Sequence, residues 1–210
     1  CFMKFVSMHI THSQTLVEII TDTQNNKKIT VWPSVELNYL VVLRDDAHMD
    51  IIIDGEENSS LHLKVLCIGQ QGHSIHSNIV TSLIWNHAQA NVTILSLLKD
   101  GSDLNVHGSI ILAPDVVKVS GHLSEENLIL GEKVKIRTAP ILDVRSSDVS
   151  ASHGCKIERL DPKRLFYMQS RGLSQNESQS LILDGYLHSL FEWFEGQEKV
   201  IQDIKELLHS

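Results

Sequence analysis

The chain has 210 residues, of which 42% are hydrophobic and 21% charged, and it carries a formal net charge of -8. These values indicate a globular protein that buries a sizeable core as one domain, with room for a small appendage. The acidic balance argues against a nucleic-acid partner, because phosphate binding needs a basic surface. No apolar run approaches the roughly 20 residues that span a bilayer, and the first ten residues do not resemble a signal peptide. We therefore expect a cytoplasmic protein without a membrane partner.

The three cysteines, Cys1, Cys67 and Cys155, are odd in number and widely separated. This pattern indicates neither a disulfide framework nor a structural zinc site, and it suits a reducing compartment. Because the chain begins with Cys rather than Met, we expect that the natural N-terminus of the protein lies outside this sequence.

Short β-prone runs fill the chain from about Val31 to Ser152, and within each run alternate residues are apolar, as on one face of a strand. Such spacing is typical of a β-sandwich or a β-helix. Hairpin signals are few, which favours the β-helix; Asp54-Gly55 and Asp100-Gly101 are the exceptions. The first thirty residues fit either an entry strand or a short helix. The clearest runs begin at Leu61, Val92, Leu104, Val117, Leu128, Val134 and Leu142.

After residue 160 the pattern changes to helix. Asp161 is a good N-cap residue, and the proline that follows it suits the first helical position. Gly172 is able to adopt the left-handed conformation that ends a helix. Ser174 and Glu177 have the spacing of a capping box, which predicts that a second helix starts there.

The second and third helices are amphipathic and together form a helical hairpin. Two interpretations of their apolar stripes stay open: burial against each other and the β core, which is the more usual arrangement, or a face that binds a partner. The stripe residues are Leu183, Tyr186, Leu187, Leu190, Phe191 and Phe194 in the second helix and Val200, Ile201, Ile204, Leu207 and Leu208 in the third.

A set of short motifs follows one another through the second half of the chain. They are Gly108-Ser109-Ile110-Ile111, Ser120 to Gly131, Ala139 to Val144, Ser147-Asp148-Val149, Ser152-His153-Gly154, Leu165-Phe166-Tyr167 and Ser170-Arg171-Gly172. Together they resemble the SufB/SufD family, the scaffold proteins of the sulfur-mobilisation machinery that builds iron-sulfur clusters. The resemblance is closer to SufD, because a SufB-like Glu-His-Glu-Ala pattern is replaced by Ser-His-Gly-Cys. Several motifs in one order make this a specific match.

The resemblance implies a mainly β protein with C-terminal helices, namely a right-handed parallel β-helix followed by a small helical domain. We place the β-helix core domain at residues 1–157 and the helical domain at residues 158–210. Full-length family members carry an N-terminal helical region before the β-helix, and this sequence has no room for it. The resemblance therefore implies either a short form or a missing N-terminal part.

The family also implies partners. Its helical domain docks the ABC-type ATPase SufC, and its β-helix edge pairs with SufB or with another SufD. We therefore expect a SufC-like ATPase and either a SufB-like subunit or a homodimer. The chain lacks a P-loop motif, so ATP dependence has to come from the partner. The implied docking residues are Phe166, Tyr167, Arg171 and Gly172, with Leu181, Ile182 and Tyr186 of the next helix in support.

His153 and Cys155 are the candidate cluster-assembly residues. Imidazole is a borderline-soft ligand that suits iron, thiolate is the usual cluster ligand, and strand residues two apart share a face. In SufD-like proteins the matching histidine lies near the interface with SufB and is implicated in cluster assembly, so His153 is also the candidate metal ligand. The alternatives are a turn histidine bonded to backbone, and a small core residue at Cys155, where the family usually has Ala.

We therefore expect a SufD-like scaffold component that is not an enzyme and binds no cofactor stably, with a transient iron-sulfur cluster at its interface with SufB. Two alternatives stay open. One is a β-helical enzyme acting on a polysaccharide, which requires paired carboxylates along a groove. The other is a homo-oligomeric structural module without a cluster role.

Overall fold

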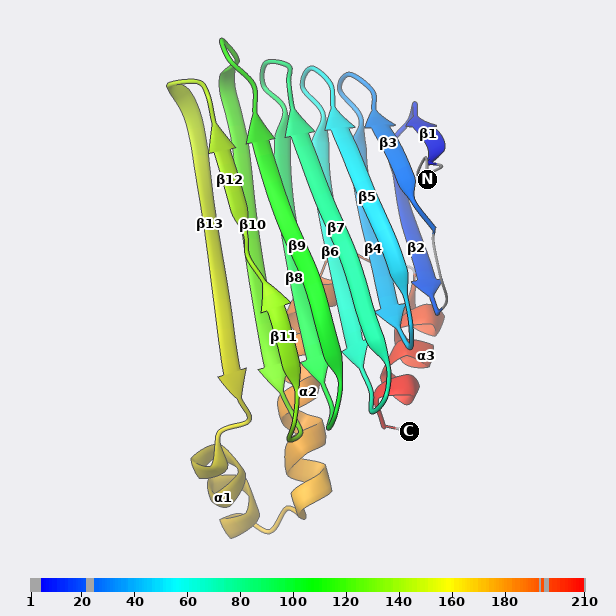
Figure 1. Ribbon diagram of the computed structural model, residues 1–210, viewed down its shortest axis with the longest axis vertical. Helices are drawn as coiled ribbons and strands as arrows, with labels where there is room; N and C mark the ends of the chain where they lie inside the picture. Colours follow the sequence, from blue (N-terminus) through cyan, green and yellow to red (C-terminus); the bar gives the residue numbers. More distant parts are fainter. Residues whose placement is uncertain (1–4, 22–24, 193, 195–196, 210) are drawn as a thin grey trace.

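The computed structural model describes residues 5–21, 25–192, 194 and 197–209, with the backbone alone at 207–209, so Cys1 lies outside the described residues. Within this part of the chain, strands β1 to β13 are followed by helices α1 to α3 (Figure 1). The structure confirms a mainly β protein that changes to helix after residue 160. The described residues among the first thirty form strands and no helix.

The strands form two parallel sheets, and the chain passes from one sheet to the other as it moves from β1 to β11. Neighbours within each sheet pair in parallel. What we call the odd sheet holds β1 (Val6–Ile10), β3 (Lys27–Val31), β5 (His48–Gly55), β7 (Ser74–Leu83), β9 (Asp103–Leu112), β11 (Lys135–Thr138) and β12 (Ile141–Val144). The even sheet holds β2 (Gln14–Ile20), β4 (Glu36–Arg44), β6 (Ser60–Gly69), β8 (Gln89–Leu98), β10 (Val117–Ile129) and β13 (Asp148–Arg159).

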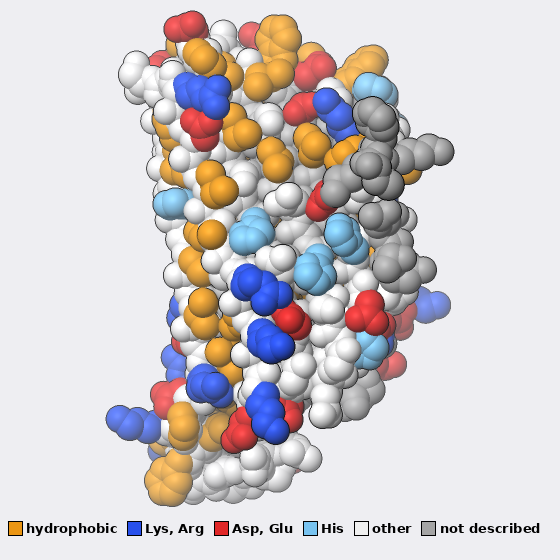
Figure 2. Space-filling model, viewed as in Figure 1, with side chains coloured by type: hydrophobic (Ala, Val, Ile, Leu, Met, Phe, Trp, Pro, Cys, Tyr) orange, Lys and Arg blue, Asp and Glu red, His pale blue; other side chains and the backbone are white. Residues whose placement is uncertain are grey.

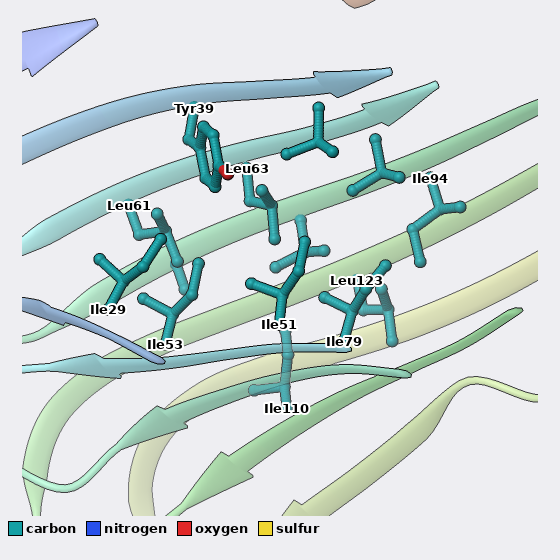
Figure 3. Close-up of a cluster of buried hydrophobic side chains, with 14 of the residues drawn as sticks. Ile29, Tyr39, Ile51, Ile53, Leu61, Leu63, Ile79, Ile94, Ile110 and Leu123 are labelled. Carbon is teal, nitrogen blue, oxygen red and sulfur yellow. The ribbon is translucent and has the colours of Figure 1, made fainter. Parts of the chain in front are cut away.

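The main core lies between the two sheets. Because side chains alternate along a strand, every second residue of each sheet points inward. Figure 3 shows Ile51 and Ile79 of the odd sheet near Leu63 and Leu123 of the even sheet, and all four are at most 2% exposed. Burial of each such side chain contributes about 1.5–3 kcal/mol. The period-2 pattern of the sequence therefore marks the inner faces of the sheets.

Helices α2 (Gln175–Phe191) and α3 (Glu198–His209) lie on the outer face of the even sheet (Figure 1). A second apolar cluster joins Leu187 of α2 and Ile204 of α3 to Leu66 and Leu95 of the sheet. The described stripe residues of both helices are thus buried or partly buried, which confirms the first interpretation of the stripes; the side chains of Leu207 and Leu208 lie outside the described residues. The division into two domains at residue 157 stays a prediction. No helix in the described part of the chain is long and apolar enough to cross a membrane.

The predicted caps fix where the helices begin. Asp161 caps α1 (Pro162–Ser170) by accepting a hydrogen bond from the N–H of Lys163 at 2.9 Å. Gly172 follows with a φ of 97°, which favours glycine. At the start of α2, Glu177 accepts from the N–H of Ser174 at 2.8 Å, and the Ser174 hydroxyl accepts from the N–H of Glu177 at 3.3 Å. Both predicted helix starts are confirmed.

Candidate functional site

Strand β13 forms an edge of the even sheet, where it pairs with β10 alone. Val149 and Ala151 in its first half pack against the main core. The rest of the strand is exposed except for the half-buried Glu158, and Ile157 has an exposed fraction of 54%. A 12-residue edge strand presents a long row of backbone groups without a strand partner, and such a row is a template for pairing with another chain. We call this segment the β13 edge.

His153 and Cys155 lie on the same side of the β13 edge. In the register with β10, His153 is opposite Leu123 and Cys155 is opposite Glu125, and both β10 residues are buried on the inward face of the sheet. His153 therefore lies within a strand rather than in a turn, and its side chain has no hydrogen-bond partner among the described residues. Its imidazole is exposed and available to a ligand.

The environment of Cys155 differs from that of Cys67. Cys67 is buried, and this burial raises the pKa of its thiol to about 12, so it is inert. Cys155 is exposed, so it is not a core residue. Desolvation, followed by the charge of Glu125 and a hydrogen bond to it, raises the pKa of the Cys155 thiol above its ordinary value. Cys155 is therefore a protonated but accessible thiol at neutral pH.

Glu125 is a polar residue of this region that sequence reasoning missed. It is 1% exposed, and its carboxylate accepts hydrogen bonds from the N–H of Gly108 at 2.9 Å and from the hydroxyl of Thr138 at 2.5 Å. The strand pattern predicts an apolar residue at this inward position, in phase with Leu123. A charged residue at an inward position was the signal that could have identified it.

The His and Cys side chains do not by themselves complete a metal centre. Within the part of the chain that the structure describes, no three His, Cys, Asp or Glu side chains converge closely enough to hold one metal ion. An iron or cluster cargo at the β13 edge would therefore need further ligands from solvent or from another molecule.

The predicted docking residues lie on α1, directly after α1, and on α2. Phe166, Tyr167 and Leu181 have exposed fractions of 73%, 59% and 54%, and hydrophobic side chains gather over α1 at the lower left of Figure 2. The guanidinium of Arg171 lies 5.3 Å from the centre of the Tyr167 ring, within the range of a cation-π contact. Gly172 follows at the end of α1.

Two grooves are lined by Tyr167, Leu181, Ile182 and Tyr186 of this set, whereas Phe166, Arg171 and Gly172 line neither. One of about 410 Å³ is lined by Tyr167 and Met168 of α1 and by Ile182 of α2. The other, of about 410 Å³, lies between α2 and the even sheet and includes Leu181, Ile182 and Tyr186. Since Ile182 lines both grooves, the two helices present one continuous, largely apolar surface. We call it the α1–α2 surface.

A hydrogen bond connects the α1–α2 surface to the β13 edge. The Tyr186 hydroxyl donates to the carboxylate of Glu158, which also pairs with Lys156 at 2.6 Å. The bonds from Lys156 and then Tyr186 hold the pKa of Glu158 below its ordinary value. Burial, and then the bond to Glu158, raises the pKa of Tyr186. Strand β13 therefore supports both candidate surfaces.

Comparison with known proteins gives the chain its family. The family model described as SUF system FeS cluster assembly, SufBD core domain, matches residues 34–186. The iron-sulfur cluster assembly protein SufD of Escherichia coli is 32% identical over 107 residues, which are 51% of this chain and 25% of that protein. SufD of Bacillus subtilis is 30% identical over 91 residues, 43% of this chain and 21% of that protein.

A SufBD family protein of Pyrococcus horikoshii is 30% identical over 97 residues, which are 46% of this chain and 21% of that protein. The chain thus spans a quarter or less of the length of these curated relatives. The core-domain match, in contrast, covers most of the chain, from β4 through the β13 edge and α1 into α2. The protein therefore belongs to the SufBD family of the SUF system for iron-sulfur cluster assembly.

Proposed function

We propose that this protein is a SufD-like scaffold component of SUF iron-sulfur cluster assembly and not itself an enzyme. The observation that carries the proposal is the match of the SufBD core domain to residues 34–186. We further propose that the body of the protein is the right-handed β-helix expected from the sequence. The passage of the chain between two parallel sheets supports this proposal.

The α1–α2 surface is the proposed docking site of a SufC-like ATPase. Helix α1 has nine residues and no buried side chain. Such a short helix is marginal in water unless its apolar side is packed. Its exposed aromatic residues, Phe166 and Tyr167, are of the kind that dominates binding energy at protein interfaces. Both features support a partner on this surface.

Co-purification of the chain with the ATPase tests the docking proposal. The double variant Phe166→Ser, Tyr167→Ser should lose the ATPase, because it removes the aromatic contacts. Trp85→Ser is the matched control, since Trp85 is also about half exposed, at 52%, but lies outside the α1–α2 surface. Unchanged association of the double variant would exclude this docking site, and loss in the control would show that the effect is not local.

The β13 edge is the proposed pairing surface for a SufB-like subunit or a second copy of the chain. Besides a row of backbone groups without a strand partner, it displays the exposed apolar residue Ile157. Ile157→Lys should separate the pair in size-exclusion chromatography because it places a charge at this apolar contact. Ile19→Lys on β2, at the opposite edge of the even sheet, is the control. A pair that survives Ile157→Lys would contradict this assignment.

His153 is the proposed ligand of the cluster cargo at that interface. Anaerobic reconstitution with iron and sulfide, in the presence of a SufB-like subunit, should give a cluster spectrum that His153→Ala loses. If the wild type binds no iron even with SufB, the site assignment fails. The same result would favour a structural module without a cluster role. That alternative and the polysaccharide-acting enzyme stay predictions.

A further inference from the structure

The carboxylate of Glu125 is buried without a positive charge beside it. Glu125 is 1% exposed, and no Lys or Arg among the described residues forms a salt bridge with it. Arg137, which precedes Thr138 in the chain, pairs with Asp103 instead, at 2.7 Å. Burial of an ionised carboxylate is costly unless a cation compensates it. The position therefore favours the binding of a cation.

The surrounding residues hold the carboxylate in one place. Gly108 and Thr138 donate to its two oxygens from β9 and β11. A Cβ atom added at Gly108 would lie 2.9 Å from Oε1 of Glu125, so the glycine provides the space that the carboxylate occupies. Two hydrogen bonds leave lone pairs of the carboxylate free, because it has about four acceptor positions.

Cys155 brings a second donor to the same place. It is the register partner of Glu125 on the neighbouring strand, and the Glu125 carboxylate is near enough to contribute to the raised pKa of its thiol. The side-chain amide of Asn127 lies 3.9 Å from the sulfur. Cys155 is exposed at the β13 edge, so an ion can reach its sulfur from solvent, next to the buried carboxylate.

We propose that Glu125 and Cys155 together bind a divalent transition-metal ion, such as Zn²⁺ or Fe²⁺, at the β13 edge. The thiol proton leaves to solvent as the sulfur-metal bond forms, and the charges of thiolate and carboxylate then balance that of the ion. Thiolate sulfur and carboxylate oxygen are both ligands of such ions. Asn127 and Thr138 orient the two donors.

This site extends the proposed function, because it lies beside His153 on the edge where a cluster would be assembled. Two donors leave coordination positions for water or for ligands from a partner. That stoichiometry agrees with the lack of three converging ligands among the described residues. The proposed metal site rests on the proposed function only for the biological role of the bound ion. Binding itself does not depend on that function, since the isolated chain already holds both donors.

The experiment is an anaerobic titration of the isolated chain with Co²⁺, followed by competition with Zn²⁺, without sulfide. The wild type should show a thiolate-to-cobalt charge-transfer absorption that Cys155→Ser abolishes. Glu125→Gln should weaken metal binding by about tenfold or more. Replacing a residue that is merely hydrogen-bonded to a metal ligand already lowers metal affinity by about that factor. Glu126→Gln is the matched control, because its side chain lines the groove on the other face of β10.

Gly108→Ala adds a test that leaves both donors in the sequence. The new Cβ would displace the carboxylate, so metal affinity should fall while Cys155 is unchanged. Circular dichroism checks the fold of each variant. If Glu125→Gln does not fold, thermal unfolding decides: Zn²⁺ should raise the Tm of the wild type and not that of Cys155→Ser.

The proposal is overturned if the wild type gives no thiolate-cobalt absorption, or if Glu125→Gln binds the ion as tightly as the wild type. Neither result bears on the scaffold role, because the titration contains no sulfide, ATPase or SufB. Conversely, a cluster that forms without His153 would contradict the proposed cargo ligand and leave the metal site standing. The two proposals therefore fail separately.

Discussion

Helices α1 and α2 follow each other in the chain, and both begin with a well-formed cap, yet only α2 is packed. Five of the 17 residues of α2 are buried, among them Leu183, Leu187 and Leu190. Helix α1 buries none, although Leu165, Phe166 and Met168 give it an apolar side. The capping residues and the helical spacing of apolar residues thus determine where a helix forms. They do not determine what covers its apolar side.

The difference arises from what each helix lies against. The lower part of the even sheet has apolar residues on its outer face, such as Leu66, Leu95 and Leu128, and these receive the stripe of α2. Helix α1 lies beyond the ends of the strands and has no sheet face beside it (Figure 1). Its apolar side is left without a packing surface of this kind, which is why the two helices should respond differently to substitution.

The largest difference is expected in the free energy of unfolding. Leu187 is fully buried between α2 and the even sheet, so Leu187→Ala should lower this free energy by about 2–5 kcal/mol. Phe166→Ala on α1 should change it by less than about 0.5 kcal/mol, since the side chain is 73% exposed. Urea denaturation of both variants gives the comparison. Equal losses would show that α1 is packed in solution.

A smaller difference is expected at the caps. Ser174→Ala removes the capping box of α2 and should cost about 1 kcal/mol. Asp161→Ala removes the cap of α1, but here the loss should appear as local fraying, because α1 is not packed in the core. Global unfolding in urea and amide hydrogen exchange in residues 162–170 separate the two effects. If Asp161→Ala lowers global stability as much as Ser174→Ala, the contrast between the helices is wrong.

The strands and helix starts could be predicted because their signals are local. Alternation in β6 and β9 and the caps at Asp161 and Ser174 each depend on a few neighbouring residues. The pairing of β12 with β9 is different. It joins Ile141 to Ser109 across intervening strands, and a sequence period alone does not identify such a partner.

The candidate site was predictable for the same reason only in part. The i and i+2 spacing placed His153 and Cys155 on one face, as the register with β10 shows. The roles of Glu125 and Glu158 were missed, because each depends on a contact that is distant in sequence. Glu125 accepts a hydrogen bond from Gly108, which is 17 positions away in the sequence. Glu158 accepts one from Tyr186, which is 28 positions away.

The smallest expected effect is a pH dependence at the contact between α2 and β13. Bonds from Lys156 and Tyr186 lower the pKa of Glu158 in the folded protein. A group with a lowered folded pKa contributes stability above its unfolded value, about 4.3 for Glu, and loses it as the pH falls through the folded value. Tyr186→Phe should therefore destabilise slightly at neutral pH and by less below about pH 4. Tyr167→Phe on α1, where the ring is exposed, should show no such dependence in urea titrations at the two pH values. A destabilisation by Tyr186→Phe that is the same at both pH values would mean that Tyr186 acts through packing in the groove and not through its bond to Glu158.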